Sequence, residues 1–311
     1  MASGLGQGVR VPWAQLPAAF HGAVVERFGP IVGVTERVGG FSPGAAVRLD
    51  VADGSRVFVK AASADVNPDT PGMYRDEARI NAWLPADGVA PELLWTYDDA
   101  HCVALAFEYV DAETPHLPWR DDDLDRVLAT VRRLHTDTTP APDAAPAIDT
   151  LYSEDFSSWR GVAGGPLPPW LDTWTARHLD RLAELEAGWV EAARGDTLLH
   201  CDLRADNVLV SDERVAIVDW PFACRGTDWC DIVFFAPSVA LQDGPAPDEL
   251  LRRYGTVPDV DALTALVAAL YGFFAVGGAR PDPPGLPTVR AYQRAQGAVC
   301  QQWLRTLTGL A

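Results

Sequence analysis

The chain of 311 residues is long enough for one large domain or two small ones, and 48% of its residues are hydrophobic while 22% are charged. This composition excludes a disordered or fibrous protein. The formal net charge of −18 disfavours nucleic acids and anionic membranes as partners, because both are polyanions.

Two residue types are used sparingly. Twenty-five residues are basic, and Lys60 is the only lysine among them. The five cysteines form no CxxC pair, which disfavours a zinc site, and their odd number disfavours a disulfide framework. Residues 1–10 contain no apolar run of the signal-peptide kind, so we expect a cytoplasmic protein.

The first part of the chain predicts a small lobe rich in β-structure with one helix. A glycine-rich turn at 38–44 precedes two alternating apolar runs, 47–51 and 57–59, which flank a turn and predict a hairpin. A helix is predicted over 73–84, and two further strands over 93–97 and 103–109.

From residue 110 the pattern becomes helical. A linker-like segment at 113–118 leads to a helix over 121–134 that begins with three aspartates, followed by a loop at 139–147. The remaining predicted elements are a helix over 171–193, short strands around a polar loop over 197–218, and helices over 259–276 and 287–307.

The uncharged stretch 262–279 reaches the length of a membrane span. It contains Thr264 and Gly272 and ends in two glycines, which favours a buried core helix instead. The sequence therefore predicts an α+β fold with a β-rich lobe over 1–109 and a larger, mainly helical lobe over 110–311.

The segment Leu198–Val210 has the densest set of polar side chains, because apolar runs flank the polar core HCDLRADN. A second apolar run, Val215–Val218, ends in Asp219. Two β-like segments around such a loop place Asp202, Asn207 and Asp219 near one point. Carboxylate and amide oxygens are ligands that suit Mg²⁺ together with substrate phosphates, and a remaining carboxylate can accept a proton.

The order H-x-D-L-[KR]-x-x-N, followed by an aspartate at a strand end, resembles the catalytic and metal-binding loops of the protein kinase-like fold. The wording HCDLRADN and IVDWPFA is most similar to the aminoglycoside phosphotransferase family, which includes antibiotic kinases and kinases of choline and homoserine. The resemblance spans about residues 30–305. It implies a bilobal fold, ATP and Mg²⁺ as cofactors, and a hydroxyl group as phosphate acceptor.

By position, the resemblance assigns a role to each polar residue of the two loops. Asp202 would be the catalytic base, and Arg204 would contact the transferring phosphoryl group. Asn207 and Asp219 would hold the metal. His200 and Asp231 would be structural, bracing the loop and tying it to the helical lobe. The alternative is a surface turn with solvated acids, which the joint order and spacing disfavour.

The resemblance also assigns the nucleotide-binding residues of the first lobe. Lys60 ends a hairpin strand, as the ATP lysine of this fold does, and Glu77 would be its ion-pair partner, with Asp76 as the competing acid. Gly39 to Gly44 would cover the phosphates, with Ser42 as the contact residue. The hinge would consist of Phe107, Glu108, Tyr109 and Val110; a bare turn and a plain strand end are the alternatives for these two segments.

Other enzyme signatures are disfavoured. Residues 40–44 spell GxSxG, but Pro43-Gly44 and a strand follow Ser42 where a hydrolase elbow needs a helix. Val59 precedes the only lysine, so there is no GxxxxGK[ST] motif, and no HExxH motif occurs.

The acceptor is expected to be a small molecule, because only twelve positions separate Asp219 from Asp231, too few for a protein-kinase activation loop. An aminoglycoside or another cationic natural product is favoured, with acids at 121–123, 154, 155 and 228 as candidate contacts. A neutral or nucleoside-like acceptor is the alternative, with Trp159, Trp170, Trp220 and Trp229 either stacking on it or packing in the core.

Three other functions remain open at this stage: a kinase of a metabolite alcohol such as choline or homoserine, a non-catalytic nucleotide-binding module, and a protein kinase. The sequence does not determine the acceptor, the choice of ATP or GTP, the oligomeric state, or whether the role is resistance or biosynthesis.

Overall fold

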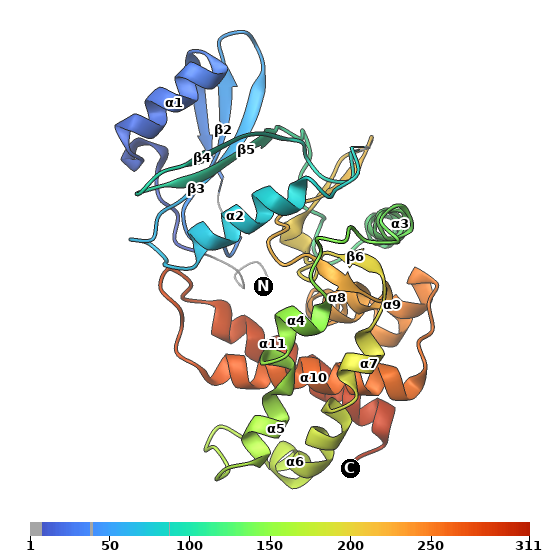
Figure 1. The fold of residues 1–311 in the computed structure, drawn as a ribbon. Coiled ribbons are helices and arrows are strands. Elements are labelled where there is room, and N and C mark those ends of the chain that lie inside the picture. The colour runs from blue at the N-terminus through green and yellow to red at the C-terminus, as the bar shows by residue number, and fades with distance from the viewer. Residues whose placement is uncertain (1–7, 38–39, 87) are drawn as a thin grey trace.

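The computed structural model describes residues 8–37, 40–86 and 88–311. The described chain forms two lobes, with a β-sheet in the upper lobe of Figure 1 and helices in the lower. The sheet has five antiparallel strands in the order β1-β2-β3-β5-β4. The strands are β1 (Ile31–Glu36), β2 (Ala45–Val51), β3 (Arg56–Ala62), β4 (Leu93–Asp98) and β5 (Val103–Glu108). The predicted α+β bilobal fold is confirmed.

Two helices cover opposite faces of this sheet (Figure 1). Helix α1 (Ala18–Phe28) follows a short turn η1 (Trp13–Gln15) and buries Phe20 and Val24 in one core of the lobe. Helix α2 (Thr70–Asn81) packs Tyr74 on the other face. The sequence did not predict α1, whose N-cap is Pro17 with no side-chain capping bond.

Helix α2 begins three residues earlier than predicted. The Asn67 side chain explains this start, because its Oδ1 accepts hydrogen bonds from the backbone N–H groups of Asp69 and Thr70 at 2.9 and 3.0 Å. These are two of the N–H groups that a helix leaves without partners at its start. The capped end fixes the helix that carries Glu77.

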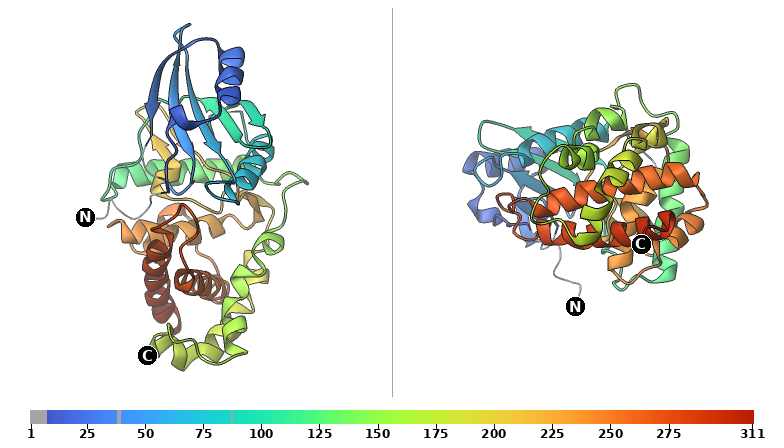
Figure 2. Two further views of the ribbon diagram at one scale, coloured as in Figure 1. Left: turned by 90° about the vertical axis from the view of Figure 1, so that its left-hand side faces the viewer. Right: turned by 90° about the horizontal axis from the view of Figure 1, so that it is seen from below.

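The C-terminal lobe is built from helices around one large apolar core. Short strands form two antiparallel pairs at its upper edge, and Figure 2 shows the long C-terminal helices side by side beneath them. The helices are α3 (Asp121–Asp137), α4 (Ile148–Tyr152), η2 (Asp155–Ser157), α5 (Ser158–Ala163), α6 (Thr173–Glu186), α7 (Trp189–Ala193), η3 (Ala205–Asn207), α8 (Trp229–Leu241), α9 (Pro247–Tyr254), α10 (Val260–Ala279) and α11 (Val289–Thr308). The strand pairs are β6 (Thr197–Leu199) with β9 (Cys224–Gly226), and β7 (Val208–Val210) with β8 (Val215–Ile217).

The prediction of one helix over 171–193 is wrong, because α6 and α7 are separate. Asp172 caps α6, since its Oδ1 accepts from the N–H groups of Trp174 and Thr175 at 2.9 and 3.0 Å. The break falls at Gly188, where an added Cβ would come within 3.3 Å of the Ala265 side chain on α10. The lack of a side chain at Gly188 therefore lets α10 approach closely where the two helices meet.

Helix α10 contains the uncharged stretch. By length and composition it is the one described helix that fits a membrane span, and 72% of that window is buried inside the lobe. It packs on α11, α6 and α7. This agrees with the prediction of a core helix.

Candidate active site

The polar loop after β6 and the end of β8 meet at one point. The backbone N–H of Val218 donates to Asn207 O at 2.9 Å, which ties the two loops together. Asn207 is 1% exposed, and its Nδ2 donates to Asp202 O at 2.8 Å and to Asp202 Oδ2 at 3.1 Å. The nitrogen end of this amide therefore faces Asp202, and its oxygen end is left as a donor for a cation.

Two residues of these loops have a backbone conformation that is unusual for non-glycine residues. Cys201 has φ 64° and Asp219 has φ 62°. Such left-handed positions cost about 1–3 kcal/mol each and persist only where the surroundings hold them. They occur directly before Asp202 and two positions after β8, and the third described non-glycine residue with positive φ, Asp243 at 56°, follows α8.

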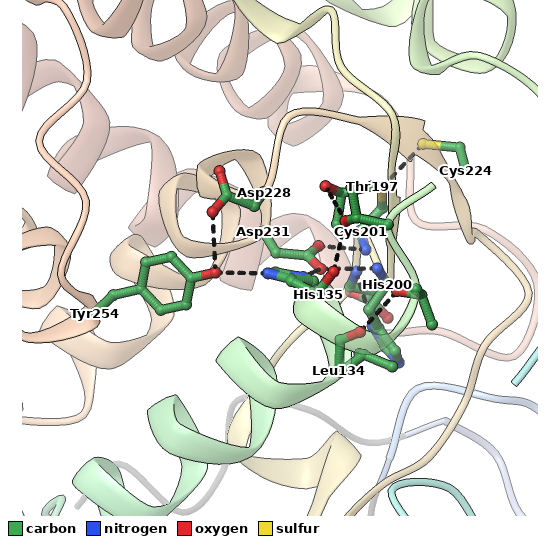
Figure 3. Close-up of polar contacts among 12 residues, drawn as sticks. Leu134, His135, Thr197, His200, Cys201, Cys224, Asp228, Asp231 and Tyr254 are labelled. Atoms are coloured by element: carbon green, nitrogen blue, oxygen red, sulfur yellow. Dashed lines mark hydrogen bonds and ion pairs between the residues drawn. The ribbon is translucent and has the colours of Figure 1, made fainter. Parts of the chain in front are cut away.

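Asp231 on α8 holds the first of these strained positions (Figure 3). It is fully buried, and it accepts hydrogen bonds from the backbone N–H groups of His200 at 2.8 Å and Cys201 at 2.7 Å. Behind it, His135 Nε2 lies 3.0 Å from Asp231 Oδ2, and His135 Nδ1 lies 2.8 Å from the Tyr254 hydroxyl. Burial would raise the pKa of Asp231, but the hydrogen bond and charge of His135 hold that pKa below its usual value.

The His200 side chain braces the loop from within. Its Nδ1 accepts from the backbone N–H of Asp202 at 3.1 Å, so Nε2 carries the proton and donates to Val218 O at 2.9 Å. Burial lowers the pKa of His200, which favours this neutral form. The imidazole thus joins the Asp202 loop to the segment that follows β8 and carries Asp219.

Asp202 is ion-paired with Arg204. Arg204 NH1 lies 2.9 Å from Asp202 Oδ1, and its Nε and NH2 bind the Asp206 carboxylate at 3.0 and 3.1 Å. Burial raises the pKa of Asp202 to about 6, with the Arg204 charge opposing the shift and the Asp206 and Asp219 charges adding to it. A carboxylate with this pKa is mostly ionised at neutral pH and is poised to take up a proton.

Lys60 on β3 connects the lobes. It is 5% exposed, its Nζ lies 2.5 Å from Glu77 Oε2, and it is also ion-paired with Asp219. Burial raises the pKa of Glu77 to about 7, with Lys60 opposing the shift and Asp219 adding to it. Burial would raise the pKa of Asp219 as well, but the charges of Lys60 and Arg204 outweigh that effect and lower it. Lys60 is thus shared between two carboxylates.

A cavity of about 530 Å³ lies between the lobes, and Lys60, Glu77 and Asp219 line it. Ser42 in the glycine-rich turn and the hinge residues 107–110 line it too, while Gly39 of that turn lies outside the described residues. The structure also places here Arg10 and Tyr74, which the sequence did not single out. Tyr74 has one sequence signal, because it precedes Glu77 by three positions on the same helix.

The hinge residues differ in what their side chains contact. Phe107 is 6% exposed and its ring lies 5.6 Å from Lys60 Nζ. The Glu108 carboxylate pairs with Arg214 at 2.9 Å, and the Glu108 backbone N–H donates to Glu92 O at 2.9 Å. An adenine ring would therefore have to bind other backbone groups of this segment.

A second cavity of about 400 Å³ continues toward the C-terminal lobe, and it shares Ser42 and Asp219 with the first. Asp202 and Arg204 line it, so the predicted base and its ion-pair partner face this second cavity. Among the acids proposed as acceptor contacts, Asp155 lines this cavity. The acids at 121–123, 154 and 228 are not among the described residues that line it.

The four tryptophans considered for stacking mostly pack in the core. Trp159, Trp220 and Trp229 are at most 8% exposed, although Trp220 borders the first cavity. Trp170 is 40% exposed and lines a separate hollow beside α10 and α11. Among the described residues none of these rings lines the second cavity.

The cysteines are free thiols, and the described residues hold no cluster of three His, Cys, Asp or Glu side chains suited to a metal. Mg²⁺ does not need such a cluster, because it takes one or two carboxylates together with phosphates and water. Asp219 lines both cavities, and the buried Asn207 amide beside Asp202 is the other hard oxygen donor of these two loops, so the donor set fits such an ion.

Comparison with known families gives one match. Residues 34–266 match the model of the APH family, described as the phosphotransferase enzyme family. This span includes the glycine-rich turn, Lys60, Glu77 and both polar loops. Comparison with curated protein sequences finds no match.

Solved structures of small-molecule kinases share the fold. A thermostable mutant of the aminoglycoside phosphotransferase APH(4)-Ia, with ADP and hygromycin B, has a TM-score of 0.58 at 15% identity, covering 91% of this chain and 98% of that one. A choline/ethanolamine kinase family protein from Mesorhizobium loti has a TM-score of 0.58 at 18% identity, covering 96% and 93%. APH(3'')-Id from Streptomyces rimosus, with ADP and streptomycin, has a TM-score of 0.52 at 20% identity, covering 83% and 99%.

Proposed function

Because the chain belongs to the phosphotransferase enzyme family, we propose that it transfers the γ-phosphate of ATP to a hydroxyl group of a small molecule, with Mg²⁺. One observation carries this proposal. Two cavities meet at Asp219, the first lined by Lys60 and the second by Asp202, so a nucleotide and an acceptor can meet at the acidic junction.

In this proposal one lobe binds the nucleotide, and the other binds the acceptor and supplies the catalytic residues. Residues 1–109 hold the nucleotide, with Ser42 and Lys60 at the phosphates and the 107–110 segment at the base. Residues 110–311 supply the catalytic loop and the acceptor cavity. Bound Mg²⁺, held by Asn207 and Asp219, would neutralise phosphate charge as it develops.

The chemical step follows from the place of Asp202. Its carboxylate orients the acceptor hydroxyl and accepts its proton, the hydroxyl oxygen forms a bond to the γ-phosphorus, and the bond from that phosphorus to the β,γ-bridging oxygen breaks. ADP leaves with the electron pair of that bond. Arg204 lies on the same cavity wall, and its guanidinium can stabilise the phosphoryl group in transfer.

Membership of the family supports a small molecule as the acceptor but does not identify the chemical class of that molecule. The sequence favoured a cationic natural product such as an aminoglycoside, and Asp155 is the predicted acidic contact that lines the second cavity. The structural neighbours named above are kinases of different small alcohols, and their low identity extends only the fold to this chain.

The test is ADP release with Mg²⁺-ATP across hydroxylated small molecules, together with ATP binding measured by calorimetry. Asp202→Asn serves as the blank. We expect acceptor-dependent ADP release in the wild type, loss of it in Asp202→Asn, and retained ATP binding in that variant. Failure of the wild type to bind Mg²⁺-ATP, or unchanged turnover in Asp202→Asn, would contradict the proposal.

A further inference from the structure

The second cavity has aromatic walls. Eight aromatic side chains line its 400 Å³, contributed by the glycine-rich turn, α4, η2, α8, α10, α11 and the loop before β9. Aliphatic side chains such as Leu270 and Val289 fill the spaces between them. A volume of this size lies within the range of about 300–1,000 Å³ that is typical of pockets for drug-sized ligands.

The rings support one another, so the wall is preformed. Phe156 stacks on Tyr152 with 5.2 Å between ring centroids and an interplanar angle of 27°. It meets Phe234 and Phe273 edge-on at 5.6 and 5.9 Å. Because these contacts hold the rings in place, a ligand with an apolar face can bind without rearranging them.

The two carboxylates at the catalytic end of this cavity each have a cationic partner within the protein. Asp202 shares Arg204 with Asp206, and Asp219 shares Lys60 with Glu77. The remaining carboxylates on the wall belong to Asp155 and Asp69, and Asp69 is exposed at the start of α2. Because the carboxylates at the catalytic end already have cationic partners, Asp155 is the partly buried acid of the described lining that is left to pair with an ammonium group, and a ligand with several such groups lacks partners for the rest.

From these contacts we infer that the acceptor is an alcohol built on a largely apolar ring framework, with no more than one cationic group. This inference rests on the proposed function and narrows its acceptor class. The hydroxyl lies at Asp202, the ring framework lies on the Phe156 wall, and a single cation, where present, faces Asp155. Gln296, buried at 6% exposure, adds one amide to the wall for a polar substituent.

The test compares two sets of acceptors in the ADP-release assay with Mg²⁺-ATP. Chloramphenicol is an uncharged aromatic alcohol and puromycin is a ring-bearing alcohol with one amine, whereas kanamycin and streptomycin carry several cationic groups. We expect Asp202-dependent ADP release with at least one compound of the first set, and none above background with the second. Asp202-dependent turnover of kanamycin or streptomycin would overturn the inference while leaving the phosphotransferase itself intact.

A variant at the cavity mouth adds a second measurement. Phe222 lines the cavity and is 36% exposed, so Phe222→Ala should fold normally. We expect the KM of the apolar acceptor to rise at least fivefold while kcat and the KM of ATP stay within twofold. Trp170→Ala is the matched control, because it removes an exposed ring outside the cavity; an equal effect of both variants would contradict the inference.

If neither set of acceptors supports turnover, the inference is tested by measuring whether the compounds bind. Calorimetry in the presence of Mg²⁺ and the non-hydrolysable analogue AMP-PNP measures the same four compounds. Binding of the apolar alcohols that Phe222→Ala weakens supports the inference. Binding of the polycations alone, or of none of the four, overturns it. Binding of AMP-PNP itself reports separately on the proposed function.

A second inference rests on a different set of contacts. It concerns the first cavity, which is lined by Lys60, Glu77 and Asp219 and is named the nucleotide cavity below. The segment 8–11 lies against the glycine-rich turn: Gly8 N–H donates to Gly40 O at 2.8 Å, and Val11 N–H donates to Gly44 O at 3.0 Å. Val9 N–H donates to Gly285 O in the other lobe at 2.8 Å. This segment precedes the part of the chain that the family model matches, which begins at residue 34.

Arg10 is placed by these bonds inside the nucleotide cavity. Its NH1 donates to Ser42 O at 2.7 Å, and its NH2 would lie 2.9 Å from a Cβ added at Gly40. Arg10 and Lys60 line the same cavity, next to the turn that would cover the phosphates. We propose that Arg10 binds the phosphates of the nucleotide, as a guanidinium suits phosphate oxygens.

The experiment uses Arg10→Gln in the full chain and compares the affinities for Mg²⁺-ATP and for adenosine. We expect the Kd of ATP to rise about tenfold and that of adenosine to stay within twofold, because adenosine has no phosphate. Arg27→Gln, which removes an arginine from α1 outside the cavity, is the matched control. An unchanged ATP affinity, or an equal loss for adenosine, would show that Arg10 does not bind phosphate.

Discussion

The Asp231 carboxylate on α8 accepts the backbone N–H of Cys201 at 2.7 Å, and Cys201 is the residue with positive φ directly before Asp202. A helix of the C-terminal lobe thus fixes the conformation of the loop that carries Asp202 through one buried side chain. His135 on α3 supports that carboxylate from behind, so three parts of the lobe converge on the loop.

Asp231→Ala should destabilise the protein strongly. It leaves the N–H groups of His200 and Cys201 buried without a partner, at a cost of about 1–3 kcal/mol for each unsatisfied group. We expect the free energy of unfolding in urea to fall by about 3 kcal/mol or more, and activity to fall with it. Asp122→Ala, at an exposed acid of α3, is the control. A loss below about 1 kcal/mol at Asp231 would show that the loop conformation does not depend on it.

The activity should fall on the acid side near pH 6. Burial raises the pKa of Asp202 to about 6, and a base is lost when it is protonated, so kcat/KM for Mg²⁺-ATP should decrease as the pH drops through that value. Because the Arg204 charge lowers the pKa of Asp202, Arg204→Gln should shift this fall in kcat/KM to higher pH while reducing the maximal rate. If kcat/KM falls at the same pH in Arg204→Gln as in the wild type, a group other than Asp202 is responsible for the fall.

Asp219→Ala should weaken the binding of Mg²⁺-ATP. It removes a proposed metal ligand and one of the two carboxylates that pair with Lys60. We expect at least a tenfold higher Kd for Mg²⁺-ATP, about 1.4 kcal/mol, with little change for adenosine. Asp228→Ala is a matched control, since Asp228 lines neither of the two cavities. Wild-type nucleotide affinity in Asp219→Ala would argue against the metal role.

Thiol labelling should be slow and confined to one residue. Cys102, Cys224, Cys230 and Cys300 are buried, while Cys201 is partly exposed at the second cavity. Burial raises the pKa of Cys201, which keeps the thiol protonated and slow to react. We expect a colorimetric disulfide reagent to modify at most one thiol in the native protein and five after unfolding. Native-state labelling that persists in Cys201→Ser would place another thiol within reach.

The sequence predicted most reliably those features that depend on residues close together in the chain. Asp202, Asn207 and Asp219 lie on two short loops joined by paired strands, so their spacing alone brings them together. The hairpin around residues 52–55 and the buried α10 followed from apolar patterns of the same local kind.

What the sequence did not predict depends on distant contacts. Arg10 lies in a segment without a recognisable motif, and it reaches the nucleotide cavity only because 8–11 bonds to the glycine-rich turn. His135 is one polar residue on the buried side of α3, and its partner Asp231 is 96 positions away. Gly188, at the break between α6 and α7, lies close to α10, and a pattern within 171–193 does not contain that contact.

Lys60 has a practical consequence beyond its ion pairs. It is the only lysine of the sequence, and it is 5% exposed at the wall of the nucleotide cavity. The surface therefore offers no lysine for amine coupling, acetylation or ubiquitin attachment, and an amine-directed reagent has one side chain to modify besides the terminal amine. Burial would lower the pKa of that side chain, but the charges of Asp219 and Glu77 raise it, so the ammonium of the folded protein stays protonated and resists the reagent. Modification of Lys60, read by mass spectrometry, therefore reports the opening of the cleft or the loss of those ion pairs.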